Sequence, residues 1–499
     1  MEFTYFLPLI SLCITFSCFN LLRRRRRSPT PGPYPFPIIG NIHQLGPKPH
    51  QSLTSLSKIH GPLMHLKLGT IHAVIISSPE LAREILQRHD QSFPGRMATA
   101  ATKALRHHLF SVACLPAGSQ WRLLRRLCRE EMFSPPRLDA GRKLRRRNLQ
   151  KLLGYVEKCC DDRKSVDVNE AAFVTSLNLI SNTLFSVDFA DYGEGSSQEL
   201  KGIVHGLMRV LGSFNVADYF PIVGVFDPQG IERDAGRYMG RLMAVFDGII
   251  DRRKESPEKK DDLLEALLSR EKESELSRDD IKHLLLDLFV AGTETTSGTV
   301  EWIMTELMRN PCILSKANSE LQSILGQNKA LLEESDISKL PYLQAVVKET
   351  FRLHPPGAFI SRQKDGDEAE IGGHVVPGNA VVLVNIWGIG RDSRIWGNPD
   401  EFEPERFLNE NIVMDVKGQD FELIPFGAGR RICPGQALAH RMVHVMVGAL
   451  VHNFDWKVEN DGMKLNGEEV DVSEKFGLSL QKALPLKAMP IKLYDREGY

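Results

Sequence analysis

The sequence predicts a mainly helical protein with a minor β-sheet near its amino end, preceded by one transmembrane helix. Apolar residues recur at helical spacing along most of the 499-residue chain, for example at 79–89, 121–132, 141–160, 240–254, 279–309 and 340–353. Two other segments are rich in β-branched residues. Residues 63–77 are expected to form a hairpin around Gly69-Thr70, and 380–386 a further strand. The third observation is the apolar character of residues 1–22.

This first segment has the length and charge pattern of a membrane anchor. Residues 1–22 carry no charge other than Glu2, and as a helix they would reach about 30 Å, enough for a bilayer core. Five consecutive arginines at 23–27 follow the apolar segment, whereas a cleavable signal peptide carries its positive charge before it. The order favours a retained single-pass anchor with the rest of the chain on the cytosolic side. A signal peptide is the alternative.

A stiff neck is expected between the anchor and the body of the protein. Proline occupies every second position from Pro29 to Pro37, which excludes a continuous helix and favours extended backbone. Residues 23–41 are therefore a polybasic and proline-rich neck. Because no linker, repeat or low-complexity run follows, residues 42–499 are expected to form one domain.

Charge and cysteine usage exclude several classes of protein. Lys plus Arg and Asp plus Glu both number 63, so no overall charge favours nucleic acid. Basic clusters at 122–129 and 142–147 are either solvated helix faces or docking sites for an acidic protein or a cofactor carboxylate. The eight cysteines include no C-x-x-C pair, which argues against structural zinc and a disulfide scaffold.

One cysteine stands in a distinctive loop. Residues 425–435 read PFGAGRRICPG and precede a long apolar segment with helical period. The two spaced glycines permit a tight turn, and Pro434 suits the first position of a helix. The Cys433 sulfur is then expected at a helix amino terminus, where unpaired N–H groups favour a thiolate. An isolated cysteine would more simply be a buried small side chain, but this combination resembles the haem-binding loop of the cytochrome P450 superfamily, which implies that Cys433 is a ligand of haem iron.

A second distinctive segment interrupts the long helix expected at 281–309. AGTETT at 291–296 places Gly292 and several hydroxyl residues inside an apolar helix. Threonine can bond to preceding carbonyls, so the sequence predicts a local bulge that opens room beside the iron. Glu294 and Thr295 are the candidate catalytic pair that delivers protons during oxygen activation. A threonine-rich kink without chemistry is the alternative.

Three short motifs accompany these segments. They are W-x-x-x-R at 121–125, ETFR at 349–352 and PERF at 404–407. Together with the neck, AGTETT and the cysteine loop, they resemble the microsomal plant members of the cytochrome P450 superfamily. The resemblance implies the P450 fold, haem b (iron protoporphyrin IX) with Cys433 as axial thiolate ligand, and an endoplasmic reticulum membrane location.

The resemblance also assigns roles to individual residues. The candidates for contact with the haem are Trp121, Arg125, Arg362, Phe426 and Arg431. Arginines are expected there because they form charge-assisted bonds to carboxylates such as the propionates. Ser361 stands where many plant relatives have proline. Glu349, Arg352 and Arg406 are expected to form a buried structural triad, whose charges are tolerated only when paired.

Electrons are expected to come from a separate protein. The glycine clusters at 388–393 and 427–432 lack the pattern and context of a dinucleotide-binding fingerprint. The implied partners are NADPH–cytochrome P450 reductase, membrane lipid, a small apolar substrate and O2, with NADPH acting only through the reductase. The arginines at 122–129 are candidates for the docking face.

Substrate class is suggested by three further stretches. Residues 215–230, 417–431 and 450–459 resemble the plant terpenoid hydroxylases that include geraniol hydroxylases and ferruginol synthase-like enzymes. This implies hydroxylation of a monoterpenoid or an abietane-type diterpenoid, in one or several successive oxidations. The candidate pocket residues are Leu288, Ala291, Gly357, Ala358, Phe359, Ile360 and Leu478.

Three alternatives stay open at this point. A haem-thiolate isomerase or dehydratase would act on a peroxide and would need no oxygen activation. The substrate could be a non-terpenoid apolar plant metabolite, such as a phenolic. A haem-based sensor or electron carrier is the non-enzymatic alternative, and it has no need for a long apolar helix with an acid–alcohol pair.

Overall fold

The computed structural model of the protein describes residues 30–192, 195–326, 331–409, 414–460, 463–464 and 470–493. They divide into two compact units, one made of the described residues up to Met97 together with Phe359–Ile389, the other of Ala98–Ala358 and the described residues from Gly390 onward. The predicted anchor and the arginine run lie outside the described residues. Within the described ranges, no helix combines the length and apolar character needed to cross a bilayer.

The sheet of the first unit is built around the predicted hairpin. Strands β1 (Leu63–Leu68) and β2 (Ile71–Ile76) pair antiparallel, and Gly69 adopts a φ of 58° at the turn between them. Strand β2 pairs parallel with β7 (Val381–Asn385), which in turn pairs antiparallel with β4 (Phe359–Gln363). The strand order is β1-β2-β7-β4. Both predicted strand regions are therefore confirmed, and they lie in one sheet.

The described part of the neck lies along β1. The Asn41 N–H donates to the Lys67 carbonyl at 2.6 Å, and the Asn41 side chain accepts from the Lys67 N–H at 2.9 Å. Further toward the amino end, the His65 N–H donates to the Pro31 carbonyl at 2.7 Å. Gly32 is required here, because an added Cβ would lie 2.1 Å from the His65 carbonyl oxygen. The neck residues thus cover the edge of the sheet.

Short elements complete the first unit. They are 3-10 helices η1 (Ile42–Gln44) and η3 (Asp90–Ser92), helices α2 (Pro49–His60), α3 (Pro79–Arg83) and α17 (Ile386–Ile389), π-helix η2 (Glu84–Arg88), and the hairpin of β5 (Ala369–Ile371) and β6 (His374–Val376). The helix expected at 79–89 is confirmed as helical, but its second half has π geometry.

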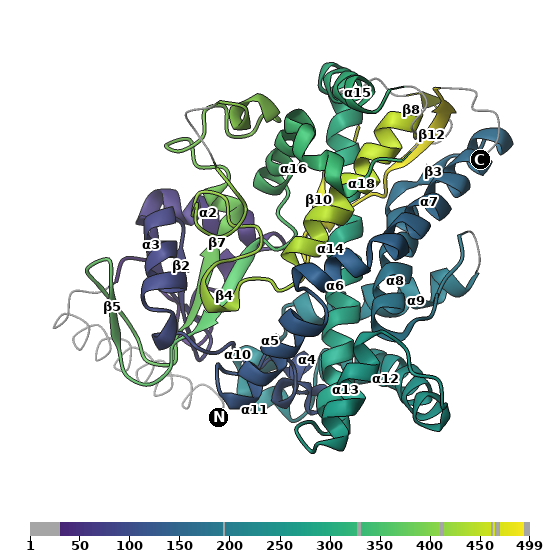
Figure 1. Ribbon diagram of the computed structural model, residues 1–499. Helices are drawn as coiled ribbons and strands as arrows, with labels where there is room; N and C mark the ends of the chain where they lie inside the picture. Colours follow the sequence, from purple (N-terminus) through teal and green to yellow (C-terminus); the bar gives the residue numbers. More distant parts are fainter. Residues whose placement is uncertain are drawn as a thin grey trace, which may run out of the picture. The chain divides into compact units, whose positions relative to one another are not determined.

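The second unit is mainly helical, as predicted (Figure 1). Its α-helices are α4 (Ala100–Lys103), α5 (Ser119–Glu131), α6 (Pro135–Ala140), α7 (Arg142–Asp162), α8 (Val168–Phe185), α9 (Gly195–Gly212), α10 (Val216–Tyr219), α11 (Pro221–Gly224), α12 (Ile231–Glu255), α13 (Leu263–Lys272), α14 (Arg278–Arg309), α15 (Pro311–Leu325), α16 (Pro341–Leu353) and α18 (Gln436–Asn453). The 3-10 helices are η4 (Ala104–Leu109), η5 (Glu334–Lys339), η6 (Pro404–Phe407) and η7 (Gly429–Arg431).

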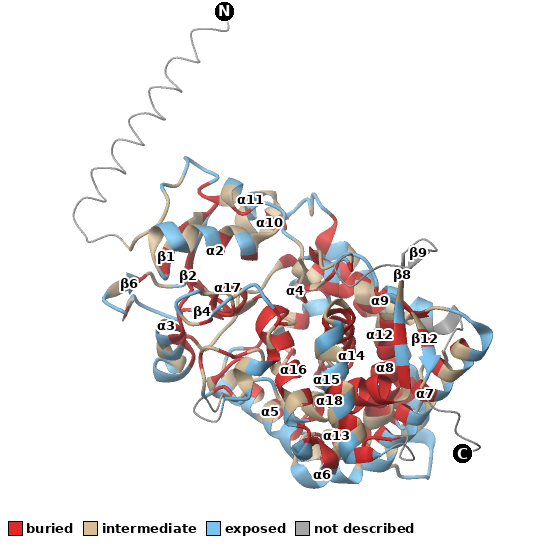
Figure 2. Ribbon diagram, turned by 90° about the horizontal axis from the view of Figure 1, so that it is seen from above, coloured by how far each residue is buried: buried red, intermediate tan, exposed pale blue. Residues whose placement is uncertain are grey.

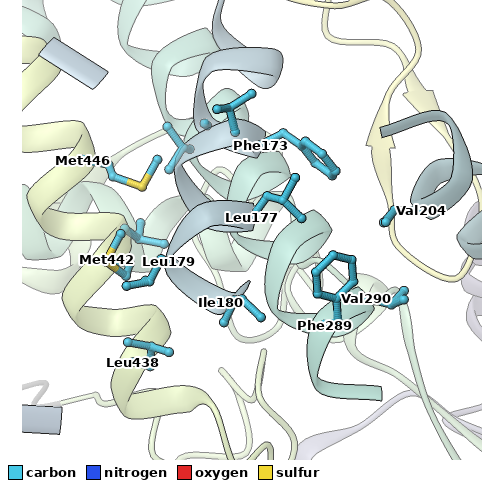
Figure 3. Packing of buried hydrophobic residues seen from close by; sticks show 14 of the residues in the cluster. Phe173, Leu177, Leu179, Ile180, Val204, Phe289, Val290, Leu438, Met442 and Met446 are labelled. Carbon is cyan, nitrogen blue, oxygen red and sulfur yellow. The ribbon is translucent and has the colours of Figure 1, made fainter. Parts of the chain in front are cut away.

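Helix α14 forms the centre of this unit. It begins with a capping box in which the Ser277 hydroxyl accepts from the Asp280 N–H and the Asp280 carboxylate accepts from the Ser277 N–H. It packs against α8, α12, α16 and α18, and Figure 2 shows the buried stretches of α8 and α14 in red. Phe289 and Val290 of α14 lie near Ile180 of α8, in the same core as Met442 of α18 (Figure 3). The core of the second unit is therefore organised around one helix.

Strands near the carboxyl end form a second sheet that the sequence did not predict. Strands β3 (Val166–Asp167), β12 (Lys487–Lys492), β8 (Phe454–Asn460) and β9 (Met463–Lys464) follow one another in the order β3-β12-β8-β9. Strands β10 (Glu474–Lys475) and β11 (Gln481–Lys482) form a separate hairpin. Several of these strands are only two residues long, too short for an alternating pattern to be visible in the sequence.

Candidate active site

The cysteine loop presents its sulfur at the surface of the polypeptide. The Cys433 side chain is exposed, and the Cys433 N–H donates to the Phe426 carbonyl at 2.9 Å. Gly427 and Gly429 adopt φ values of 76° and 70°, a left-handed conformation that glycine alone adopts without strain. The loop therefore turns tightly and fixes the cysteine backbone.

The helix after this loop begins later than predicted. Pro434 was expected at the first helical position, but α18 begins at Gln436 with Gly435 as its N-cap. Pro434 and Gly435 form a turn between the cysteine and the helix. The sulfur therefore lies just before the first turn of α18.

Trp121 and two arginines gather beside the cysteine loop. The guanidinium carbons of Arg431 and Arg125 lie 4.8 Å and 5.7 Å from the centre of the Trp121 ring. Arg125 donates to the Ile432 carbonyl at 2.8 Å, and Arg431 donates to the Leu115 carbonyl. The Trp121 N–H donates to a backbone carbonyl at 3.1 Å. The structure thus brings three predicted haem-contact residues together around the cysteine.

The electrostatics of this cluster suit an anion. Burial lowers the pKa of Arg125, while negative charge on Cys128 or Cys433 opposes that effect. Cys128 is itself fully buried, and burial raises its pKa to about 12, so it remains a neutral thiol. A cation held beside Cys433 favours the thiolate form of that cysteine and can also pair with a carboxylate.

Part of one face of α14 is accessible to solvent. Ala291 is exposed and Thr295 and Gly298 are partly exposed, although most of the helix is buried. The spacing of four and three residues places these small residues on one side of the helix. We call this stripe the open face of α14. Helix α14 packs against α18, the helix that follows the Cys433 loop.

The predicted bulge in AGTETT is wrong. Helix α14 is a continuous α-helix from Arg278 to Arg309. Its threonine hydroxyls do bond to preceding carbonyls, as expected, with Thr295 donating to Ala291 at 2.7 Å and Thr296 donating to Gly292 at 3.1 Å. These bonds are satisfied within the helix without interrupting it. Gly292 instead allows close approach of α8, since an added Cβ would lie 2.8 Å from the Ile180 side chain.

Glu294 lies away from the open face. Its side chain is buried, and its Oε1 accepts from the Ser479 hydroxyl at 2.7 Å and from the Gln481 amide. Its other oxygen, Oε2, has no hydrogen-bond partner among the described residues. Burial raises the pKa of Glu294 to about 7, against opposing effects of Ser479 and Lys475. The structure therefore separates the two members of the predicted catalytic pair, with Thr295 on the open face and Glu294 turned toward β10 and β11.

A buried polar cluster also borders the open face. The Nδ1 atoms of His107 and His283 lie 2.8 Å apart, and His107 Nε2 lies 3.2 Å from Asp287. The Ser111 hydroxyl donates to the Asp287 carboxylate at 2.8 Å. Burial and the neighbouring His107 lower the pKa of His283 to about 4, so this ring is neutral near pH 7. The cluster fastens the segment that contains η4 to α14.

Two residues of that segment have unusual backbone geometry. Leu105 and Arg106 have φ values of 49° and 60°, which are uncommon for residues other than glycine. The contacts among the cluster residues were not predicted. Asp287 could have been found, because it lies one helical turn before Ala291, whereas His107 carries no signal in the sequence.

The predicted triad forms a buried ion-pair network. Arg352 and Glu349 make two hydrogen bonds, of 2.7 Å and 2.8 Å, and both side chains have zero exposure. Arg406 donates to Glu349 at 3.0 Å. Arg352 also donates to the carbonyls of Gly390 and Pro399, each at 2.6 Å. Every charge in the network therefore has an opposite charge or several carbonyl partners.

The predicted pocket residues have different environments. Leu288 and Ala358 are buried, whereas Leu478 is 51 % exposed. The Leu480 N–H donates to the Pro356 carbonyl at 2.7 Å, which brings the Leu478 turn and the Gly357 segment together.

Three predicted site residues belong to the other unit. Phe359 and Ile360 are half-buried residues of β4, and the Arg362 guanidinium donates to the Ser361 carbonyl at 2.9 Å. Their predicted contacts with substrate and haem stay predictions.

A haem fits the donor set of the second unit. The cysteine loop offers an uncovered sulfur, the Trp121 cluster offers two guanidinium groups for carboxylates, and α14 offers an open face of small residues. The sulfur suits the iron, the guanidinium groups suit the propionates, and the open face suits the porphyrin plane. Among the described residues, no group of three His, Cys, Asp or Glu side chains could hold a metal ion by itself. The exposed Cys433 sulfur and the two guanidinium groups suit a metal held by one thiolate and a macrocycle with carboxylates.

Replacing Glu294 by glutamine is expected to remove part of the pH dependence of stability. Burial raises the pKa of this carboxyl in the fold from 4.5 to about 7, so the native state disfavours the charged form. The stabilising contribution is present below the unfolded pKa and is lost as pH rises through 7, by about 2–3 kcal/mol. Thermal unfolding of both proteins at pH 5 and pH 8 should show the wild type losing stability relative to the variant. An equal difference at both pH values would contradict this assignment.

This site and fold define the class of haem-thiolate oxidoreductases. A family model of cytochrome P450 matches residues 30–481. The chain is 51% identical over 464 residues to cytochrome P450 76T24 of Catharanthus roseus, covering 92% of each chain. It is 47% identical to ferruginol synthase 1 of Rosmarinus officinalis, covering 92% and 93%, and 46% identical to cytochrome P450 monooxygenase 76AD131 of Lophophora williamsii, covering 91% of both. The protein belongs to the cytochrome P450 family and is an enzyme of that family.

Proposed function

We propose that the protein is a terpenoid hydroxylase that inserts one oxygen atom from O2 into a monoterpenoid or an abietane-type diterpenoid. The observation that carries this proposal is the uncovered Cys433 sulfur beside the Trp121 cluster, in a chain similar to ferruginol synthase 1. The small residues of the open face suit a ligand held mainly by shape and burial.

In this proposal each residue of the site has a separate role. When bound, haem b with a Cys433 thiolate ligand supplies oxygen activation, because the sulfur pushes electron density onto iron. Arg125 and Arg431 hold the propionate carboxylates through charge-assisted bonds. The Thr295 hydroxyl on the open face orients a proton donor toward the reacting oxygen, and Glu294 is the proton source.

The proposal includes a membrane setting and a protein partner. Residues 1–22 anchor the chain in the endoplasmic reticulum membrane, with the catalytic domain on the cytosolic side. NADPH–cytochrome P450 reductase in the same membrane supplies the electrons, so NADPH acts only indirectly. Exposed Arg122, Arg126 and Arg129 on α5 support a docking face for an acidic partner.

Microsomes containing the full chain and reductase test this function. Incubation with a panel of monoterpene alcohols and abietane diterpenes, read by mass spectrometry, is expected to give a product heavier by one oxygen atom. The product should require NADPH, reductase and dioxygen, and should carry label from 18O2. Turnover without dioxygen would favour an isomerase or dehydratase. A labelled product from a phenolic panel alone would contradict the terpenoid assignment.

A further inference from the structure

The carboxyl group of Glu294 is held by two side chains from one turn. Ser479 donates its hydroxyl to Oε1 at 2.7 Å, and the Gln481 amide donates to the same oxygen. Oε2 has no hydrogen-bond partner among the described residues, and the residue is 3 % exposed. A buried oxygen without a partner is costly when charged but can carry a proton at little cost. One oxygen is thus bonded to donors while the other is available for a proton.

The two donors are fixed by contacts that do not involve Glu294. The Leu480 N–H, between them in sequence, donates to the Pro356 carbonyl at 2.7 Å. Gln481 also pairs with Lys475 in the β10–β11 hairpin. Gly212 at the end of α9 approaches this turn so closely that an added Cβ would lie 1.9 Å from the Leu478 nitrogen. The turn therefore holds its position independently, and Glu294 is the group that is oriented by it.

Other titratable groups lie on α14 and on the elements near Glu294. Lys475 on β10 lowers the pKa of Glu294. His205 on α9 is partly buried near Lys475, and burial lowers its pKa to about 4, so it is neutral. Glu301, further along α14, has a pKa raised to about 7 by burial and accepts from the Leu486 N–H at 2.9 Å. Because both carboxyl groups have a pKa of about 7, an experiment on Glu294 must separate its titration from that of Glu301.

We propose that Ser479 and Gln481 are positioning residues for the proton source of the proposed function: they fix the Glu294 carboxyl beside β11 and stabilise its charged form. This rests on the proposed function, in which Glu294 is the proton source for Thr295. In this step Oε2 releases its proton to the relay that ends at the Thr295 hydroxyl, and the two donors stabilise the carboxylate that remains. A proton from solvent then restores the acid. Loss of either donor makes Glu294 a weaker acid, so a larger share of the reduced oxygen is expected to take two protons from solvent and be lost as hydrogen peroxide.

Infrared titration of the full-length ferric enzyme tests the proposal directly. The carbonyl stretch of the protonated Glu294 is identified by its absence in Glu294→Gln, which also separates it from Glu301. In Ser479→Ala the titration midpoint is expected to rise by about one pH unit, a tenfold weaker acid, because a hydrogen bond to the charged form is lost. Gln481→Ala should shift it in the same direction, and Ser479→Thr, which keeps the hydroxyl, should restore it. Ser473→Ala, on the same segment but bonded to Asp471, is the matched control.

The second measurement is the fraction of consumed NADPH that leads to product and not to hydrogen peroxide. The fraction of NADPH consumption recovered as hydrogen peroxide should rise several-fold in Ser479→Ala and Glu294→Gln, with the carbon monoxide spectrum unchanged. An unshifted midpoint in both Ser479→Ala and Gln481→Ala overturns the positioning role, even if Glu294→Gln is uncoupled. Normal coupling in Glu294→Gln overturns the proton-source role, and the proposal with it. Failure of the proposed hydroxylase function is distinguishable, because it appears as no oxygenated terpenoid in the wild type.

Discussion

A Cys433→Ser variant is expected to lose the red-shifted Soret band of the reduced protein under carbon monoxide, together with all turnover. The Cys433 sulfur is exposed, and the carbonyl of the preceding residue, Ile432, accepts a hydrogen bond from Arg125. A serine hydroxyl has a pKa far above that of a thiol and cannot supply a charged sulfur ligand to iron. The measurement is a carbon monoxide difference spectrum, with haem content determined on the same sample.

Two other cysteines provide matched controls for this variant. Cys312 on α15 is exposed, and Cys128 is buried about one turn after Arg125 on α5. Cys312→Ser should retain the full spectrum, and Cys128→Ala should retain the position of the band even if some protein is lost. A thiolate-type spectrum in Cys433→Ser would show that a different residue holds the iron.

An Arg352→Ala variant is expected to lose about 3–5 kcal/mol of stability and to fail to incorporate haem. Removal of this guanidinium leaves the Glu349 carboxylate at zero exposure, with Arg406 as its one opposite charge among the residues that the structure describes. The carbonyls of Gly390 and Pro399 lose their donor as well. Urea unfolding and the ratio of haem to protein measure the two effects.

Arg394→Ala is the control for Arg352→Ala, because it removes an ion pair at the surface. Arg394 pairs with Asp392 at the surface and is 69 % exposed in its side chain, so Arg394→Ala should change stability by less than about 1 kcal/mol. Arg352→Lys should recover only part of the loss, because lysine cannot bond to Glu349 and to several carbonyls in a fixed fork. If Arg352→Ala and Arg394→Ala had similar stability and similar haem content, the buried network would not be needed for folding or for haem binding.

Helices were predictable from sequence where apolar spacing was long and regular. The segment expected at 279–309 is α14, Arg278–Arg309, and the one expected at 340–353 is α16, Pro341–Leu353. The bulge in α14 was wrong, because composition indicates that threonines compete for backbone bonds but not whether they do so within an intact helix. The carboxyl-terminal strands were missed, since their pairing is long-range and each strand is short.

The candidate site could be predicted only where its residues belong to local motifs. Trp121, Arg125 and Arg431 come together because W-x-x-x-R lies on one helix and the third residue lies beside the cysteine. Ser479 could not be predicted as a partner of Glu294, since 185 residues separate them and a serine in a turn has many simpler uses. The orientation of Glu294 depends on that distant turn, so adjacency to Thr295 in sequence gave the wrong geometry.

The close approach of Ile180 to Gly292 limits which parts of the proposed substrate pocket can move to admit a larger substrate. With 2.8 Å between the Ile180 methyl and the position of a Cβ at 292, α8 and α14 are locked together and cannot slide or separate without loss of core packing. In the proposed substrate pocket, adaptation to substrates of different size is then expected from the segment around η4 and from the turn at 477–479. Laboratory evolution toward larger guests should accumulate changes there and leave the pair of helices intact.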